Sequence, residues 1–264
     1  MLLDAVILVL REVLEAAFLL CVMLVFGQVL ALRSRWVGLG LLLAAVGVAL
    51  YAGGMQGITD ALEGAGQEVL NAALQMTVFL LLMPVLALGV IAARRMRQCG
   101  RVLPGLMAAA VGLALVRESA EILIYVRAFS AVDEYRLGVY AGSALGLGIG
   151  ASAGVLAWSA LRALRPARAF PVCLGLLAVI GAGMVMQAAL LLEQVDWLPA
   201  QPPLWDSSWL LSEQSLLGQL LFAVLGYEAT PGPVQVALYV GSLGLAALSI
   251  WLGYRIGGRA NDTL

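Results

Sequence analysis

The sequence predicts an all-α membrane protein that crosses the bilayer several times, and three observations predict it. Of its 264 residues, 62% are hydrophobic and only 12% are charged, which is far from the balance of a soluble globular domain. Apolar windows of about 20 residues, the length that crosses the hydrocarbon, recur seven times along the chain. These windows are continuously apolar, whereas the strands of a membrane barrel alternate in polarity.

Seven helices are therefore expected, and we place them at residues 4–31, 36–55, 68–93, 103–127, 138–161, 170–192 and 232–256. The first lacks the basic flank of a signal peptide, and Arg11 and Glu12 interrupt its apolar run, so we expect it to be retained. Residues 209–225, before the last helix, are apolar enough for a half-buried helix, either re-entrant or interfacial. Flanking acids and prolines argue against an eighth span.

The charged residues predict the orientation of the helices. All 15 basic residues are arginines, and eleven of them follow every second helix: Arg33, Arg35, Arg94, Arg95, Arg97, Arg101, Arg162, Arg165, Arg168, Arg255 and Arg259. The positive-inside rule makes that side the cytoplasm, so the N-terminus is expected outside and the C-terminus inside. The opposite connections are acidic: Asp60, Glu63, Glu68, Asp133, Glu134, Glu193, Asp196, Asp206, Glu213 and Glu228. Such a face either controls solubility and topology or attracts cations.

One charged motif occurs twice inside apolar helices. Arg11-Glu12-x-x-Glu15 recurs as Arg117-Glu118-x-x-Glu121, 106 residues and three helices later. A repeat over an odd number of spans is inverted, an arrangement that transporters use to build a site near the midplane. At 1.5 Å per residue, both motifs are expected at the same depth, roughly 12–14 Å below the outer helix ends.

The predicted organisation is a single transmembrane permease domain over residues 1–264. Its parts are a first repeat at 1–93, a second at 103–192, an extracytoplasmic connection at 193–231, and a seventh helix with a cytoplasmic tail at 232–264.

The spacing of the motif predicts its chemistry. Residues three and four apart share a helix face, so each pair of glutamates points together and each arginine reaches the second glutamate. If the two helices face each other, their four carboxylates and two guanidiniums carry a formal charge of −2, which suits cations or protons. Oxygen ligands favour hard ions, but they do not by themselves separate ferric iron from Mn(II) or Ca(II).

The alternative interpretation of these residues is structural, because buried Arg–Glu pairs also hold membrane helices together. The occurrence of the motif twice, at matched depth and with two acids per base, favours function. The predicted metal ligands are thus Glu12, Glu15, Glu118 and Glu121, with Arg11 and Arg117 as charge partners. Glu68, Glu193 and Asp206 are candidates for an access route from outside.

Other polar and small residues are less specific. The absence of histidine excludes bis-histidine haem and most zinc or type-one copper sites, and Cys21, Cys99 and Cys173 form no disulfide or zinc pattern. Gln75, Thr77 and Gln187 either line a path or bond helices together, while Met184 and Met186 are expected to pack. A glycine at every fourth position from 138 to 154 predicts close helix packing or a sliding seam, and Gly53, Gly54 and Gly57 either end the second helix or form a hinge.

The two motifs, R-E-V-L-E at 11–15 and R-E-S-A-E at 117–121, resemble those of the high-affinity iron permeases, the oxidase-dependent iron transporters of fungi and their bacterial iron-uptake relatives. The late residues Glu193, Trp197-Leu198-Pro199 and Trp205-Asp206-Ser207-Ser208 are similar to the bacterial branch. Family members often carry Gly as the third motif residue, where this chain has Val13 and Ser119.

The resemblance implies a transporter, not an enzyme, that imports ferric iron across the cytoplasmic (inner) membrane, with the four motif glutamates as ligands. It implies no permanently bound cofactor, since ferric iron is the substrate, and a separate extracytoplasmic protein that oxidises or delivers the iron. A partner among nucleic acids is not expected. Two alternatives stay open: transport of another metal cation such as Mn or Pb, and a non-transporting membrane anchor of a redox complex.

Overall fold

The computed structural model describes residues 1–95, 101–212 and 215–259, and within these ranges the chain is helical, without strands. Arg97, Cys99, Glu213 and the tail from residue 260, all named in the predictions above, lie outside the described residues. The α-helices are α1 (Leu2–Val29), α2 (Arg35–Asp60), α3 (Gly66–Arg95), α4 (Val102–Ser130), α5 (Asp133–Arg162), α6 (Pro166–Gln194), α7 (Leu216–Leu225) and α8 (Pro233–Arg259), and a short 3-10 turn, η1 (Ala61–Gly64), follows α2.

The seven predicted long helices are all present, and five of them, α2, α3, α5, α6 and α8, are long and apolar enough to cross a membrane. The chain is thus all-helical and has the helices of a polytopic membrane protein. The motif helices α1 and α4 are not among the five, so the count of seven spans stays a prediction. Large apolar side chains are exposed on α2, α5 and α8, as lipid-facing surfaces require: Leu41, Leu42, Leu50, Leu137, Leu156 and Val240.

Most of the long helices extend beyond their predicted ends, and α5 and α2 show why. The helix α5 begins at Asp133, not at 138, with Asp133 and Glu134 in its first turn, where negative charge complements the helix dipole. The helix α2 continues through Gly53, Gly54 and Gly57 to Asp60, so the interpretation of these glycines as a helix end is wrong. Little packs against these glycines, so the only cost they bring to the helix is their low helix propensity.

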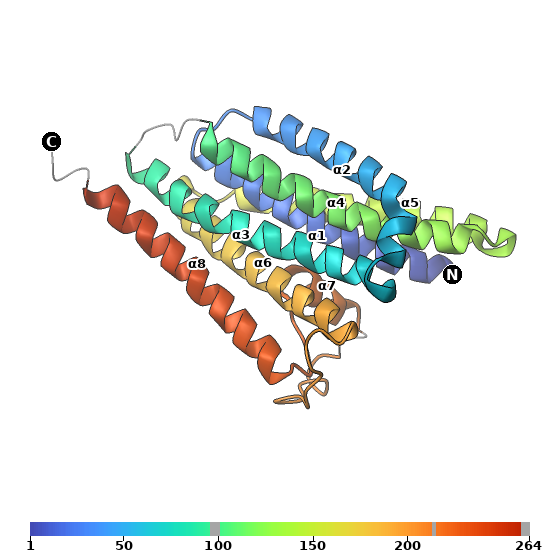
Figure 1. Cartoon of the computed structure of the whole chain (residues 1–264). Helices are drawn as coiled ribbons and strands as arrows, with labels where there is room; N and C mark the ends of the chain where they lie inside the picture. The colour runs from blue at the N-terminus through green and yellow to red at the C-terminus, as the bar shows by residue number, and fades with distance from the viewer. Residues whose placement is uncertain (96–100, 213–214, 260–264) are drawn as a thin grey trace.

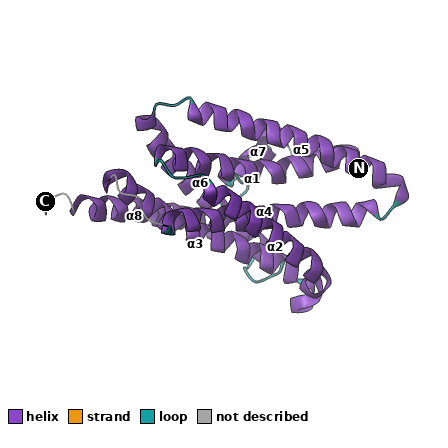
Figure 2. Cartoon of the chain, turned by 90° about the horizontal axis from the view of Figure 1, so that it is seen from above, coloured by secondary structure: helices purple, strands orange, loops and turns teal. Residues whose placement is uncertain are grey.

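The long helices form one bundle in which each motif helix packs against the other half of the chain (Figure 1). The helix α1 lies along α5, α2 lies along α4, α3 lies along α6, and α1 also contacts α4. Figure 2 shows α5 beside α1 from above. This set of pairs is unchanged when α1, α2 and α3 are exchanged with α4, α5 and α6. The helix α8 packs outside these six, against α3 and α6, and Met1 and the end of α8 lie at opposite ends of the bundle (Figure 1).

The glycine stripe of α5 forms its contact with α1. A Cβ at Gly142 would lie 2.5 Å from the Leu2 carbonyl oxygen, and one at Gly146 would lie 2.6 Å from the Val6 carbonyl oxygen. Any side chain there would collide with backbone, so the two helices approach as closely as glycine allows. The predicted close packing is confirmed.

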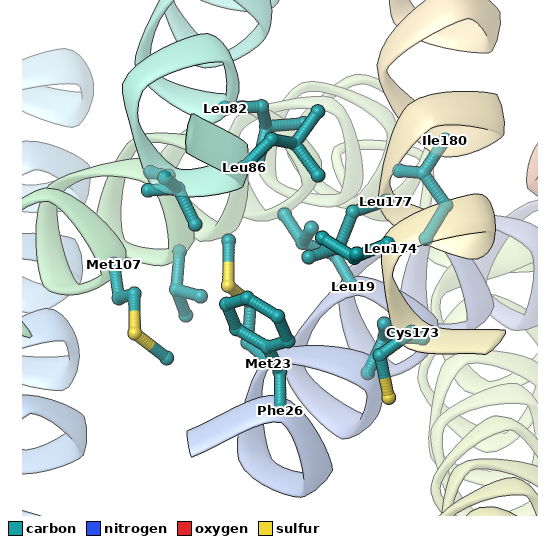
Figure 3. Close-up of a cluster of buried hydrophobic side chains, with 14 of the residues drawn as sticks. Leu19, Met23, Phe26, Leu82, Leu86, Met107, Cys173, Leu174, Leu177 and Ile180 are labelled. Atoms are coloured by element: carbon teal, nitrogen blue, oxygen red, sulfur yellow. The ribbon is translucent and has the colours of Figure 1, made fainter. Parts of the chain in front are cut away.

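A buried apolar cluster fills the half of the bundle toward the arginine-rich end. Figure 3 shows side chains from α1, α3, α4 and α6 meeting there, among them Leu19, Met23, Phe26, Leu82, Leu86, Met107, Leu174 and Leu177. The ring of Phe26 stacks on that of Phe170 with centroids 5.7 Å apart. The buried thiols of Cys21 and Cys173 are free, as predicted for packing residues. The interior between the helices is therefore filled with apolar side chains in this half of the bundle.

The helix α7 lies within the connection between α6 and α8. Ser215 caps its start by accepting a hydrogen bond from the Gly218 amide at 3.0 Å, and it ends at Gly226, whose φ of 68° favours glycine. Ten residues span about 15 Å, half of the hydrocarbon thickness. The helix is therefore shorter than the predicted segment 209–225. It packs against α1 and α6. The connection runs from 195 to 232, because Glu193 and Gln194 belong to α6.

Candidate metal centre

The two motifs meet where α1 and α4 lie side by side, and Arg117 is their common contact. Its Nη1 lies 2.6 Å from Glu118 Oε2, 2.9 Å from Glu15 Oε2 and 3.6 Å from Glu12 Oε2. Its Nη2 lies 2.7 Å from Glu121 Oε1. One guanidinium thus contacts all four predicted carboxylates, and the expected pairing of Arg117 with Glu121 is only a part of this arrangement.

Arg11 lies at the edge of the same cluster. Its Nε is 3.3 Å from Glu15 Oε1 and 3.8 Å from Glu12 Oε1, so the expected pairing with Glu15 is confirmed. On its other side, Arg11 Cζ lies 4.6 Å from the ring centroid of Phe222 in α7, within the range of a cation–π contact. The Arg11 side chain is 34% exposed, whereas that of Arg117 is 5% exposed.

The cluster is buried but not fully bonded. Glu12, Glu15, Arg117 and Glu118 are all buried, yet Glu12 Oε2 and Arg117 Nε have no hydrogen-bond partner. A charged group at bilayer depth costs about 2.5–3.5 kcal/mol on insertion scales, and an unbonded buried oxygen adds to that cost. Burying six charged side chains together costs more free energy than is needed merely to hold two helices in contact.

The arrangement determines what the cluster can bind. Within the described ranges, no group of three or more Asp, Glu, Cys or His side chains is placed so that it could hold a metal ion. The four motif carboxylates instead converge on the guanidinium of Arg117. They form a site for a positive group, and their role as metal ligands stays a prediction.

A cavity of about 330 Å³, lined by both polar and apolar side chains, reaches Glu121 of this cluster from the end of the bundle that bears Met1. It opens between the start of α3 and the ends of α4 and α6, and Glu68, Asn71 and Glu121 line it with Gln67, Tyr125 and Gln194. The side chain of Glu121 is 26% exposed, so it is the motif carboxylate that the cavity reaches. The cavity thus joins the predicted access residue Glu68 to the cluster.

A stripe of polar residues continues down α3 from this cavity. Glu68, Asn71 and Gln75 follow one another at helical spacing, and each has a buried oxygen without a hydrogen-bond partner. Asn71 Nδ2 lies 3.5 Å from Glu121 Oε1, and Gln75 Nε2 donates to Gln187 Oε1 at 2.6 Å. The stripe ends at this bond between α3 and α6.

Asn71 is the one residue of this stripe that sequence reasoning missed. Its spacing of three from Glu68 and four from Gln75 was the signal that could have found it.

The other sequence candidates lie elsewhere. Glu193 Oε2 accepts a hydrogen bond from Gln235 Nε2 at 2.7 Å, which joins the ends of α6 and α8, and it does not line the cavity. Asp206 is exposed, and its hydrogen bond from the Ser208 amide lowers its pKa. Thr77 bonds to the Ala73 carbonyl of its own helix. Met184 and Met186 are buried among apolar side chains, as predicted.

Comparison of the chain with protein-family models, with curated proteins and with solved structures gives no match.

Proposed function

We propose that this chain is a permease that imports ferric iron across the cytoplasmic membrane, acting as a transporter and not as an enzyme. The observation that carries the proposal is the convergence of four carboxylates, two from α1 and two from α4, one of which, Glu121, lines a cavity that opens at one end of the bundle. A net negative cluster that is reached from one end and blocked by apolar packing at the other suits the uptake of a cation.

The direction of transport follows from the arginines. Most of the described arginines lie at the end opposite to the cavity, which the positive-inside rule makes cytoplasmic, so the cavity faces outward. The chain would cross the membrane seven times, with α1 and α4 included, and the position of Met1 and of the end of α8 at opposite ends of the bundle supports an odd number of spans. The exchange symmetry of the helix pairs supports two inverted three-helix repeats, around which the site would alternate in access.

The choice of iron rests on the resemblance of the motifs R-E-V-L-E and R-E-S-A-E to those of the iron permeases. Carboxylate ligation suits a hard trivalent ion, and it also suits rivals such as Mn. A separate extracytoplasmic protein that oxidises or delivers iron would dock on the acidic end of the bundle, where Asp60, Glu63, Asp133 and Glu134 are exposed.

Uptake of radiolabelled iron by cells that express the chain tests the proposal. Glu12→Gln and Glu118→Gln each keep the shape of the side chain but remove a charge that the ion needs, and we expect each to lower uptake at least about tenfold. Arg35→Gln, which removes an exposed charge at the opposite end of the bundle, is the control and should leave uptake unchanged. Uptake in E12Q and E118Q equal to that of the unaltered protein would contradict the proposal.

Competition in the same assay identifies the cargo. A hundredfold excess of Mn(II) or Pb(II) should leave iron uptake largely intact if ferric iron is the substrate. Loss of iron uptake with either metal would show that the site also accepts that cation, so ferric iron would not be its specific cargo.

A further inference from the structure

The guanidinium of Arg117 occupies the point that the four motif carboxylates share. It is buried, it comes from α4, and it reaches across to both glutamates of α1 as well as to both of its own helix. A hard metal cation bound by these glutamates would need the same oxygens, at metal–oxygen distances of about 2.0–2.6 Å. The guanidinium and such an ion cannot both take all four carboxylates.

The bonding of Arg117 is incomplete in two respects. Its Nη1 carries two hydrogens but faces three carboxylates, of which Glu12 Oε2 lies at 3.6 Å and has no hydrogen bond. Its Nε, also buried, has no partner. A guanidinium placed to fix a structure would use its planar fork on one or two carboxylates. Here one guanidinium is shared among four carboxyl groups.

Arg11 provides the comparison within the same cluster. It has the same place in its motif, but it reaches only Glu15 and Glu12, at 3.3 and 3.8 Å, and its other face is covered by Phe222. An ion could therefore take the four carboxylates without moving Arg11, whereas Arg117 would have to move.

From these contacts we propose that Arg117 is an internal competing cation, which holds the four carboxylates together until a metal ion displaces it and whose return releases the ion. This inference rests on the proposed function and adds a means of release to it. Displacement begins on the side of Glu121, because that carboxylate lines the cavity through which the ion arrives.

Equilibrium binding and uptake, measured together, test this role. The full chain is purified and reconstituted in lipid vesicles, and ferric citrate labelled with radioactive iron is the probe. We compare R117Q with R11Q, because each removes one positive charge from the cluster. If Arg117 competes with the ion, R117Q should bind iron at least about tenfold more tightly than the unaltered chain and take it up more slowly, whereas R11Q should change binding by less than about threefold.

The opposite pattern would overturn the inference. If R117Q binds iron no more tightly than R11Q does, Arg117 is not a competitor for the site. A structural role alone would weaken binding and uptake together, so tight binding with slow uptake separates the two roles. If the unaltered chain neither binds nor takes up iron, the proposed function fails; if it does both and R117Q is no tighter, only this inference fails.

A second variant covers the case in which R117Q does not fold. R117K keeps the charge on a shorter side chain with a single ammonium, which cannot contact four carboxylates at once, so it should also bind iron more tightly than the unaltered chain. The melting temperature should rise more on adding ferric citrate in R117K than in the unaltered chain. An equal or smaller rise would count against competition.

Discussion

Arg11 in α1 and Arg117 in α4 have the same place in the two motifs, yet their surroundings differ. Arg117 is buried and contacts all four motif glutamates, while Arg11 is one-third exposed and contacts the two of its own helix. The second glutamates differ as well, because Glu121 lines the cavity and Glu15 does not.

The difference originates in elements that the repeat does not contain. Arg11 lies against Phe222 of α7. The helix α7 belongs to the connection before α8 and is part of neither three-helix half. Two copies of one motif can therefore take different roles when an added segment covers one of them. In this bundle, the α4 copy faces the cavity and the α1 copy faces α7.

The largest expected effect is the difference in the free energy of unfolding between the variants Arg117→Ala and Arg11→Ala. Removal of Arg117 leaves the buried Glu118 without a cation and Glu12 and Glu15 with Arg11 alone, and breaking a buried ion pair from one side costs about 3–5 kcal/mol. Arg11→Ala should cost about 1 kcal/mol or less, since its pairs are partly solvated. Thermal unfolding of both variants in one detergent, followed by tryptophan fluorescence, measures the contrast. Equal losses would show that the two arginines are equivalent.

The packing of the motif helices offers a second contrast. In the contact of α1 with α5, Gly146→Ala would place a Cβ 2.6 Å from the Val6 carbonyl oxygen; in the contact of α2 with α4, Gly112→Ala would lie 3.0 Å from Leu43 Cβ. We expect Gly146→Ala to cost about 1–3 kcal/mol of stability and Gly112→Ala to cost less. Gly148→Ala, on the open face of α5, meets nothing within 4 Å and is the control. A larger loss for Gly112→Ala would reverse the assignment of the tighter helix pair.

The smallest expected effect concerns the side from which the ion arrives. Glu68→Gln removes a charge from the cavity above Glu121, so it should raise the KM for iron uptake by about two- to fivefold with little change in the maximal rate. Glu193→Gln removes a carboxylate from the same end of the bundle but outside the cavity, and uptake kinetics should stay unchanged. A higher KM in Glu193→Gln alone would place the access route between α6 and α8.

The helices could be predicted from the sequence because apolar length determines them, and the shared faces of Glu12 with Glu15 and of Glu118 with Glu121 follow from helical spacing. The ends of α2 and α5 could not, because a glycine pair does not oblige a membrane helix to stop and acidic residues can begin one. The start of α7 at Leu216 was also missed, because the apolar residues Trp209, Leu210 and Leu211 placed the expected start too early.

The contacts of the site were harder to predict than its members. Spacing along one helix pairs Arg117 with Glu121, but its reach to Glu15 depends on how α1 and α4 are rotated against each other. Those rotations are set by glycine contacts with α5 and α2, which the motif does not encode. Asn71 was missed because an amide in a membrane helix is as common in a helix contact as in a path.

The packing of α1 and α2 against helices of the second half of the chain has a consequence for biosynthesis. The helices α1 and α2 follow each other in the chain but are not a packed pair; α1 lies along α5 and α2 along α4. A ribosome therefore delivers Arg11, Glu12 and Glu15 to the membrane more than a hundred residues before α5 and Arg117 exist to receive them. During that interval the charged side chains of the first helix lack the contacts of the folded bundle, and a chain cut after α3 would contain neither α5 nor Arg117.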